Sequence, residues 1–365
     1  MLEKYIYIGR YIKWKSIFKL KEINRLRQQF QRKVRKYPNT IQLPLTYVCN
    51  FDCVMCGMKN LSGKKDFTAE ELGSILKDSL FSKIEAVGVN GGEPFLKKDF
   101  EQCMDAILNE LPALKAINII SNGYCTDKIL KDLSCLKSKC SAKGVRLNLS
   151  ISVDGYGKMQ DFHRGRKNAF VNADRTCREI MNNKGQYVDG LDVICTITKH
   201  NISRINEVDV WSKALNIPVE YNIASLNRRI DNYKKENDFL LFSDRHARRL
   251  ATEFFYCKYK ETGKEKYFAL YLYLRTHKRY TECPCMYNDW VTLTPDAQIG
   301  YCATRSKNLG SALETSAYEL FNGNLKYLKM LKKKYCSECC HYSYRLNYKG
   351  LVLMHKDRMK NWFMR

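Results

Sequence analysis

The chain has 365 residues, which is long enough for two or three domains with a large buried core. It contains no apolar run long enough to predict a transmembrane helix, and its charged first residues do not resemble a secretory signal peptide. Sixteen cysteines in such a chain favour metal binding or catalysis over disulfides, so we expect a reducing, cytoplasmic environment.

The balance of charge is strongly basic, with 63 lysines and arginines against 38 aspartates and glutamates and a formal net charge of +25. Such a charge suits an anionic substrate, a nucleic acid or an anionic membrane surface. No RNA-binding or helix-turn-helix signature stands out, so a nucleic-acid partner is disfavoured.

Residues 1–40 form the most basic segment, with twelve Lys or Arg and two Glu. Apolar residues recur at helical spacing between Ser16 and Lys36, which predicts a basic amphipathic helix. Aromatic residues among the basic ones would suit peripheral contact with an anionic membrane surface, whereas such a helix more often packs on its own protein. Both interpretations stay open.

From Ile41 the chain alternates between β-rich apolar runs and helical patterns. The predicted strands are Ile41–Tyr47, Ile84–Asn90, Ala116–Ser121, Arg146–Val153, Leu191–Thr198 and Val219–Ala224. The predicted helices are Thr68–Phe81, Lys98–Leu111, Asp127–Lys143, Phe170–Asn183 and Ser203–Asn216. Thr68 followed by Glu71 has the pattern of a capping box. Six strands with helices between them predict parallel βα units, an α/β fold in which function gathers at the C-terminal strand ends.

Three cysteines, Cys49, Cys53 and Cys56, follow the first predicted strand with the spacing C-x3-C-x2-C. Iron–sulfur ligands are usually crowded into one short loop, because several thiolates must converge on one inorganic core. Three thiolates would leave one iron of a [4Fe–4S] cube open for chemistry, as a catalytic zinc keeps an open position. A structural zinc site would need a fourth Cys or His nearby, and the nearest histidine, His163, is far along the chain.

Polar turns follow the next three predicted strands. They are Gly91-Gly92-Glu93-Pro94, Ser121-Asn122-Gly123 and Ser152-Val153-Asp154-Gly155, with His163-Arg164-Gly165 shortly after the last. Glycine lets the backbone approach a ligand closely, but each motif alone is more often ordinary turn chemistry than a site. Their shared position at strand ends, in order after the cysteines, favours a binding site.

Together these motifs resemble the radical S-adenosylmethionine (SAM) superfamily. The resemblance implies a partial (β/α)6 TIM-like barrel, in which SAM chelates the open iron of a [4Fe–4S] cluster and is cleaved to a 5′-deoxyadenosyl radical that takes a hydrogen atom from substrate. It implies the cluster ligands Cys49, Cys53 and Cys56 and the SAM-binding residues Gly91, Gly92, Glu93, Asn122, Ser152, Asp154 and Arg164. Ser152 is the ribose candidate and Arg164 the carboxylate candidate. Asn201 is a weaker candidate, and Met55 stands where family members often have an aromatic residue.

A second group of cysteines lies near the C-terminus: Cys283, Cys285, Cys302, Cys336, Cys339 and Cys340. Between them, Trp290–Thr294 and Gln298–Tyr301 predict a hairpin. This region resembles the SPASM domain of radical SAM enzymes or its shortened form, twitch. The resemblance implies one auxiliary [4Fe–4S] cluster with the ligands Cys285, Cys302, Cys336 and Cys339, although Cys283 or Cys340 could replace one of them. Zinc held by four cysteines is the alternative.

We therefore expect five segments along the chain. They are a basic amphipathic helical segment (1–40), the radical SAM partial barrel (41–226), a helical connector (227–281), a small auxiliary-cluster domain (282–345) and a basic C-terminal tail (346–365).

The resemblance implies a radical SAM oxidoreductase with an electron donor such as flavodoxin or ferredoxin. We expect it to oxidise or otherwise tailor an anionic small molecule such as a sugar or aminocyclitol derivative. One alternative is a maturase that crosslinks, epimerises or oxidises a ribosomal peptide, which the absence of an obvious leader-binding domain before Ile41 disfavours. Another is a non-catalytic iron–sulfur or zinc protein that binds an anionic partner. An epimerase using Cys283 or Cys340 as a hydrogen-atom donor also stays open.

Overall fold

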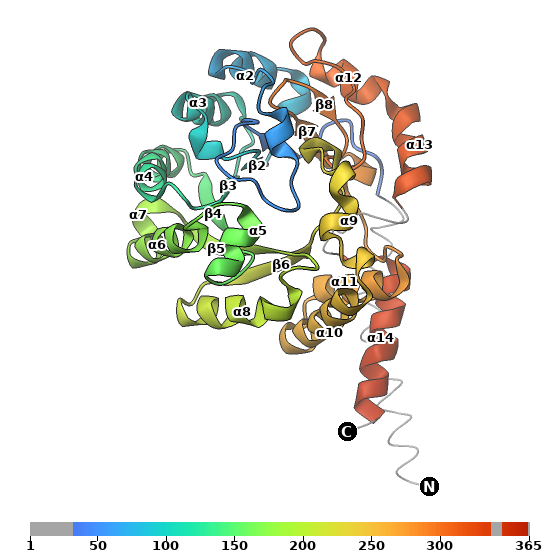
Figure 1. Ribbon diagram of the computed structural model, residues 1–365. Coiled ribbons are helices and arrows are strands. Elements are labelled where there is room, and N and C mark those ends of the chain that lie inside the picture. Colours follow the sequence, from blue (N-terminus) through green and yellow to red (C-terminus); the bar gives the residue numbers. More distant parts are fainter. Residues whose placement is uncertain (1–31, 337–344, 364–365) are drawn as a thin grey trace, which may run out of the picture.

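The computed structural model describes residues 32–336 and 345–363 of the chain (Figure 1). Its strands form one eight-stranded sheet in the order β6-β5-β4-β3-β2-β1-β7-β8. The strands are β1 (Thr40–Pro44), β2 (Ala86–Asn90), β3 (Ala116–Ser121), β4 (Arg146–Ser152), β5 (Gly190–Ile197), β6 (Val219–Ile223), β7 (Trp290–Leu293) and β8 (Ile299–Gly300). The helices are α2 (Ala69–Leu76), α3 (Phe100–Glu110), α4 (Thr126–Ala142), α5 (Lys158–Arg164), α6 (Ala169–Asn182), α7 (Lys184–Tyr187), α8 (Ile205–Ala214), α9 (Glu236–Phe239), α10 (Arg245–Thr262), α11 (Glu265–Thr276), α12 (Ala317–Gly323), α13 (Leu325–Tyr335) and α14 (Tyr348–Phe363).

The six predicted strands are β1 to β6, and each pairs in parallel with its neighbour in the sequence. Helices α2, α3, α4, α6 and α8 lie outside the curved sheet (Figure 1), so the predicted α/β partial barrel is confirmed. The prediction stopped at six strands, whereas β7 also pairs in parallel with β1 and extends the sheet at that edge.

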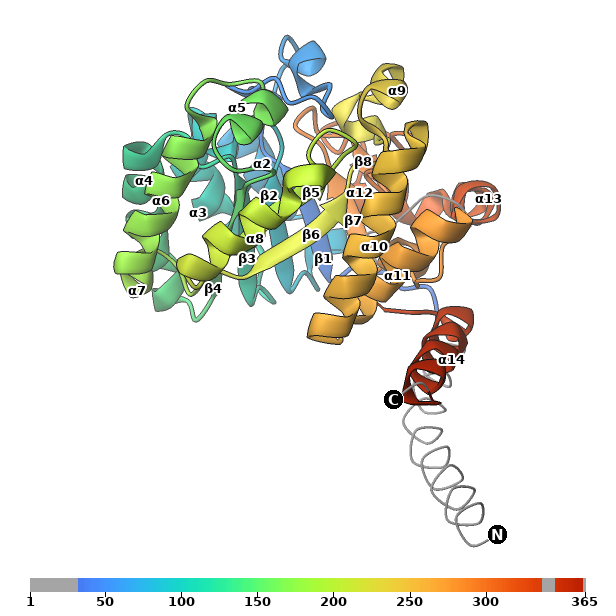
Figure 2. The ribbon, with the colours of Figure 1, turned by 60° about the horizontal axis from the view of Figure 1, so that its bottom comes forward.

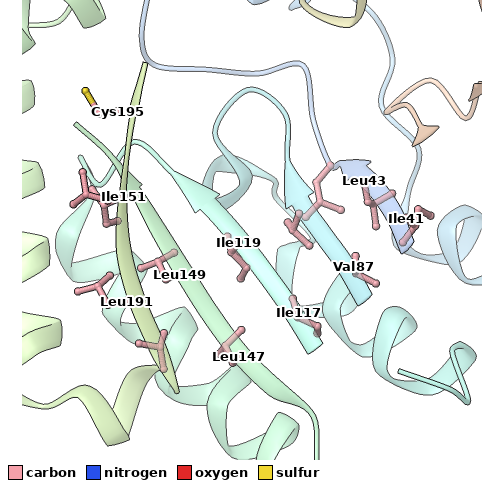
Figure 3. Packing of buried hydrophobic residues seen from close by; sticks show 14 of the residues in the cluster. Ile41, Leu43, Val87, Ile117, Ile119, Leu147, Leu149, Ile151, Leu191 and Cys195 are labelled. Atoms are coloured by element: carbon pink, nitrogen blue, oxygen red, sulfur yellow. The ribbon is translucent and has the colours of Figure 1, made fainter. Parts of the chain in front are cut away.

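The barrel forms because apolar and polar side chains alternate along its strands. Ile41, Ile119 and Leu149 are almost fully buried between sheet and helices, as are their neighbours on adjacent strands (Figure 3). The residues next to them, among them Gln42 and Asn118, instead line the cavity inside the barrel. The period of two in a strand therefore separates an apolar layer under the helices from a polar interior.

Helix α2 begins at the predicted capping box. The Thr68 side chain accepts a hydrogen bond from Glu71 N, and Thr68 N donates to Glu71 Oε2 at 2.8 Å. The predicted helix ends earlier than expected, because residues after α2 pass through a separate 3-10 turn, Ser79–Phe81, that the Asp78 side chain caps. These local bonds set where the chain turns back into β2.

The predicted helical connector, residues 227–281, begins with short 3-10 turns and α9. It continues as a pair of antiparallel helices, α10 and α11, that covers the β6 side of the barrel (Figure 2). The Tyr221 ring of β6 meets the Phe254 ring edge-on, with centroids 5.0 Å apart. Tyr267 and Phe255 are buried beside them. Lys266 on α11 forms an ion pair with Glu220 of β6.

The helix predicted between Ser16 and Lys36 is wrong over its described end, because residues 32–36 are not helical. Arg32 and Arg35 both pair with the buried carboxylate of Asp289, and Arg35 N donates to Tyr287 O at 2.9 Å. These bonds hold residues 32–35 against residues 287–289 of the C-terminal region. Residues 1–31, and with them the rest of that helix and the predicted membrane contact, lie outside the described residues.

The predicted C-terminal hairpin is present as β7 and β8, which pair antiparallel. Ala297 in its turn has a φ of 58°, a left-handed conformation that glycine adopts at less cost. Beyond the hairpin, α14 projects away from the barrel in both views (Figures 1 and 2). Among the described residues, no helix is both long and apolar enough to span a bilayer.

The buried ion pair between α11 and β6 should make stability depend on pH. Burial lowers the pKa of Lys266 to about 8, although the charge of Glu220 acts in the opposite direction. Between that value and the ordinary 10.5 the unfolded chain binds a proton that the folded chain does not, so the free energy of unfolding should rise with pH. The gain over Lys266→Met should reach roughly 3 kcal/mol in urea unfolding from pH 8 to pH 10.5. Parallel pH profiles for the two proteins would contradict this assignment.

Candidate functional site

The three N-terminal cysteines lie on a loop, residues 45–57, that leaves the C-terminal end of β1; we refer to it as the cysteine loop. The turn after β2 holds one side of this loop through backbone bonds. Gly92 N donates to Thr46 O at 2.8 Å, and Glu93 N donates to Val48 O at 2.9 Å. A Cβ on Gly92 would lie 2.0 Å from Val48 O, so only glycine allows this approach.

Helix α5 and the residue after it hold the other side of the cysteine loop. Val54 N donates to His163 O at 3.0 Å. Gly165 has a φ of 60°, and a Cβ on it would lie 2.1 Å from Asp52 O. The loop is therefore fixed between the ends of β2 and α5 by glycines that let the backbones touch.

A third segment, residues 227–240, packs against the cysteine loop; we call it the cover segment. Gly57 N donates to Ile230 O at 2.9 Å, and Asn232 Nδ2 donates to Met55 O at 2.8 Å. Lys235 Nζ donates to Cys56 O at 3.1 Å. Phe239 is fully buried in a small apolar cluster with residues of the loop. Helices α9 and α5 lie at the same end of the barrel (Figure 2), where these contacts occur.

A cavity of about 590 Å³ opens inside the barrel beneath the cysteine loop. The cysteine loop contributes Cys49, Cys53, Cys56 and Met55 to its lining, and the strand ends and α5 contribute Gly91, Gly92, Asn122, Ser152 and Arg164. The structure thus brings most of the predicted cofactor-binding residues to one cavity. Asn122 also ties the end of β3 to the loop, because its Nδ2 donates to Asn50 Oδ1 at 2.7 Å.

Glu93 is buried, and its carboxylate holds the end of β3. Ser121 Oγ and Asn122 N each donate to it at 2.8 Å. Burial raises the pKa of Glu93 to about 7, although these donors act to lower it. Its side chain is thus committed to linking the ends of β2 and β3.

Asp154 is completely buried and orients the groups around it. Its Oδ2 lies 2.9 Å from His163 Nδ1 and 2.7 Å from Arg164 Nε, while Thr196 N donates to Oδ1 at 2.7 Å. Burial alone would raise the pKa of Asp154, but the charges of Arg164 and His163 hold it below its usual value. Asn201, the weaker candidate, is also buried and donates to Asp154 O at 2.8 Å. Asp154 and Asn201 therefore act on the site indirectly, through the residues to which they are hydrogen-bonded.

The environment of the three thiols fits an iron–sulfur cluster. Met58 N points to Cys56 Sγ at 3.4 Å, and Arg164 Nη1 points to Cys53 Sγ at 3.8 Å, so donors face two of the sulfurs. Burial raises the pKa of Cys49 to about 11, so a thiolate there needs a positive partner such as iron. Within the described residues no group of His, Cys, Asp or Glu is arranged around a single metal ion, whereas ligands of a cube bind separate irons.

Four C-terminal cysteines line one small pocket, which we call the thiol pocket. Cys285 follows directly on Cys283 and Pro284, Cys302 follows β8, and Cys336 follows α13. The Cys285 thiol is within hydrogen-bond reach of both Cys283 and Cys302. Three predicted auxiliary ligands therefore converge, together with Cys283. The fourth predicted ligand, Cys339, and Cys340 lie outside the described residues.

A second cavity, of about 750 Å³, lies between the cysteine loop and the C-terminal hairpin. It shares Arg229 with the barrel cavity and Cys302 with the thiol pocket. Its lining includes Lys64, Arg228, Arg229 and Lys307, with Asp231 as the acidic residue among them. We call it the cation-lined cavity. Sequence reasoning did not find it, because its basic residues come from distant segments with no common motif.

The comparisons with known proteins agree with this geometry. The family model described as "Radical SAM superfamily" matches residues 43–208. A GTP 3′,8-cyclase of Pasteurella multocida (strain Pm70) is 32% identical over 143 residues, which cover 36% of this chain and 40% of that protein. The chain spans less than half the length of the curated relatives it matches there.

Two solved structures share the fold. Native anSMEcpe with bound AdoMet has a TM-score of 0.59 and 17% identity, and the match covers 89% of this chain and 99% of that chain. Streptococcus suis SuiB bound to the precursor peptide SuiA has a TM-score of 0.55 and 15% identity, over 86% of this chain and 69% of that chain. At these identities the likeness concerns the fold alone.

Gly165→Ala should loosen the cysteine loop, because the new Cβ would collide with Asp52 O and the left-handed backbone adds about 1–2 kcal/mol of strain. After anaerobic reconstitution we expect iron per chain to fall by up to about four atoms. Gly63→Ala is the matched control, since no atom lies within 4 Å of its added Cβ. Equal iron contents for Gly165→Ala, Gly63→Ala and the unchanged protein would show that this contact does not hold the loop.

Proposed function

We propose that this chain is a radical SAM oxidoreductase, and the match of the radical SAM family model to residues 43–208 supports this proposal. One observation carries the proposal: the three thiols of the cysteine loop line the same cavity as residues at the C-terminal ends of β2, β3 and β4. An open iron and a SAM molecule need such an arrangement, in which the ligands converge at one end of a parallel barrel.

In this proposal Cys49, Cys53 and Cys56 hold the catalytic [4Fe–4S] cluster. With SAM bound, that cluster would supply the electron for the reductive cleavage of SAM. An external donor such as flavodoxin or ferredoxin would reduce the cluster. Arg164 places a guanidinium beside the sulfur of Cys53, where it stabilises negative charge on the ligands.

The strand-end residues bind and orient SAM. The backbone of Gly91 and Gly92 lines the cavity, so it can meet the methionyl end, and the Ser152 side chain can reach the ribose. Glu93 and Asp154 act from behind these residues, since their carboxylates are already bound by protein donors. The cover segment shields the loop from water on its outer side.

The substrate proposed is an anionic small molecule, such as a sugar or aminocyclitol derivative. The cation-lined cavity supports this class, because Lys64, Arg228 and Lys307 concentrate positive charge in a concave space beside the barrel. The Pasteurella multocida relative is named for GTP, which is also an anionic small molecule. The reaction proposed is a net two-electron oxidation, for which an auxiliary [4Fe–4S] cluster in the thiol pocket would supply an electron acceptor.

Replacement of Cys49, Cys53 and Cys56 by Ala should abolish reductive cleavage of SAM. The reason is that Cys49, Cys53 and Cys56 are the cysteines among the described residues that line the barrel cavity. The measurement is 5′-deoxyadenosine formed with dithionite, quantified by chromatography. Cys135→Ala, on the exposed face of α4, should retain the original rate. Continued formation of 5′-deoxyadenosine at that rate in the triple variant would refute the proposed function.

The cation-lined cavity should bind simple polyanions. We expect calorimetry to detect inorganic pyrophosphate, and the triple variant Lys64→Gln, Arg228→Gln, Lys307→Gln to bind it at least about tenfold more weakly, since each charge-assisted hydrogen bond contributes about 1.5–3 kcal/mol. The control for net charge is Lys83→Gln, Lys98→Gln, Lys131→Gln, which removes the same number of exposed positive charges outside the cavity. If the two triple variants bind pyrophosphate equally well, the cavity does not bind polyanions and no longer supports an anionic substrate.

A further inference from the structure

Three of the predicted auxiliary ligands, Cys285, Cys302 and Cys336, lie within the described residues. The thiol pocket contains these three and one further cysteine, Cys283. Cys283 is 3% exposed and lines the pocket together with Cys285, Cys302 and Cys336. Four thiols is the number that a fully ligated [4Fe–4S] cube requires. The described residues therefore offer a complete ligand set without any contribution from Cys339 or Cys340.

Local backbone geometry explains why Cys283 and Cys285 reach the same pocket. Cys283 has an extended backbone (φ −122°, ψ 123°) and directly precedes the 3-10 turn Pro284–Tyr287, in which Cys285 lies. Met286 N donates to Cys283 O at 3.0 Å and closes that turn. The Cys285 thiol consequently lies within hydrogen-bond reach of Cys283 on one side and of Cys302 on the other.

The remaining walls of the pocket suit a group of negative charge. Arg305 and Lys332 line it, and Leu328 and Leu331 close it with apolar surface. A cube with four thiolate ligands carries net negative charge, which nearby cations stabilise in a site of low dielectric. The thiols, cations and apolar residues together are the environment of a closed cluster.

We propose that Cys283, in place of Cys339, is the fourth ligand of the auxiliary cluster, with Cys285, Cys302 and Cys336 as the others. This inference rests on the proposed function, because it assumes that the thiol pocket holds an iron–sulfur cluster. Four ligands leave no iron open to substrate, so the auxiliary cluster transfers electrons and does not bind the substrate. Cys283 is then no free hydrogen-atom donor, which removes that route to epimerisation for this residue.

The test uses the Cys49, Cys53, Cys56→Ala protein, in which bound iron can belong only to the auxiliary site. After anaerobic reconstitution, this background should contain about four irons per chain. Adding Cys283→Ala should reduce iron to near zero and remove the electron paramagnetic resonance signal of the reduced cluster. Adding Cys339→Ala should leave both unchanged. Cys177→Ala, a fully buried cysteine of α6, controls for the loss of a buried thiol.

A serine variant guards against simple misfolding. Cys283→Ser should keep part of the iron with a shifted resonance signal, because a serine oxygen can replace the thiolate. Full iron with the original signal in Cys283→Ala, or loss of iron in Cys339→Ala, would overturn the assignment. If the Cys49, Cys53, Cys56→Ala protein binds no iron at all, the thiol pocket holds no cluster and Cys283 is not a ligand. The catalytic cluster is tested separately, by SAM cleavage with the unchanged protein.

Discussion

The close backbone contact between the cysteine loop and its glycine neighbours is the constraint on which the rest of the site depends. The loop carries one buried cysteine, Cys53, and two partly buried ones, Cys49 and Cys56, yet it has no regular secondary structure across them to hold it. Gly92 and Gly165 approach it from opposite sides, at positions where a Cβ would overlap a carbonyl oxygen. Because these contacts join the loop to β2 and α5, the thiols keep a fixed position relative to the strand ends.

Next to the cysteine loop, two buried carboxylates connect the strand ends to one another. Glu93 joins the ends of β2 and β3, and Asp154 joins β4, α5 and β5. Each is buried and accepts several donors, which offsets the cost of removing its charge from water. The polar motifs that resemble cofactor contacts in the sequence therefore contain two kinds of residue. Some, such as Asn122 and Ser152, line the barrel cavity, whereas Glu93 and Asp154 hold the cavity-lining residues in position.

Features encoded by local sequence patterns could be predicted, whereas contacts between residues far apart in the chain could not. Strand-length apolar runs, the capping box and the closely spaced cysteines are local signals, and the barrel strands, the start of α2 and the hairpin follow from them. The pairing of β7 with β1 and the ion pairs of Arg32 and Asp289 join residues about 250 positions apart, which no local pattern encodes. Asp154 shares its turn with Ser152, and only the fold separates a buried carboxylate from a cavity-lining hydroxyl.

Anaerobic crystals measured at the iron absorption edge would locate any bound iron directly. We expect two separate sites of anomalous iron scattering, one against Cys49, Cys53 and Cys56 and one in the thiol pocket against Cys302. The first is the decisive one, because the clamped loop, the barrel cavity and the proposed chemistry all converge there. Zinc at the cysteine loop, or an iron site that does not contact these three sulfurs, would show that Cys49, Cys53 and Cys56 do not hold an iron–sulfur cluster.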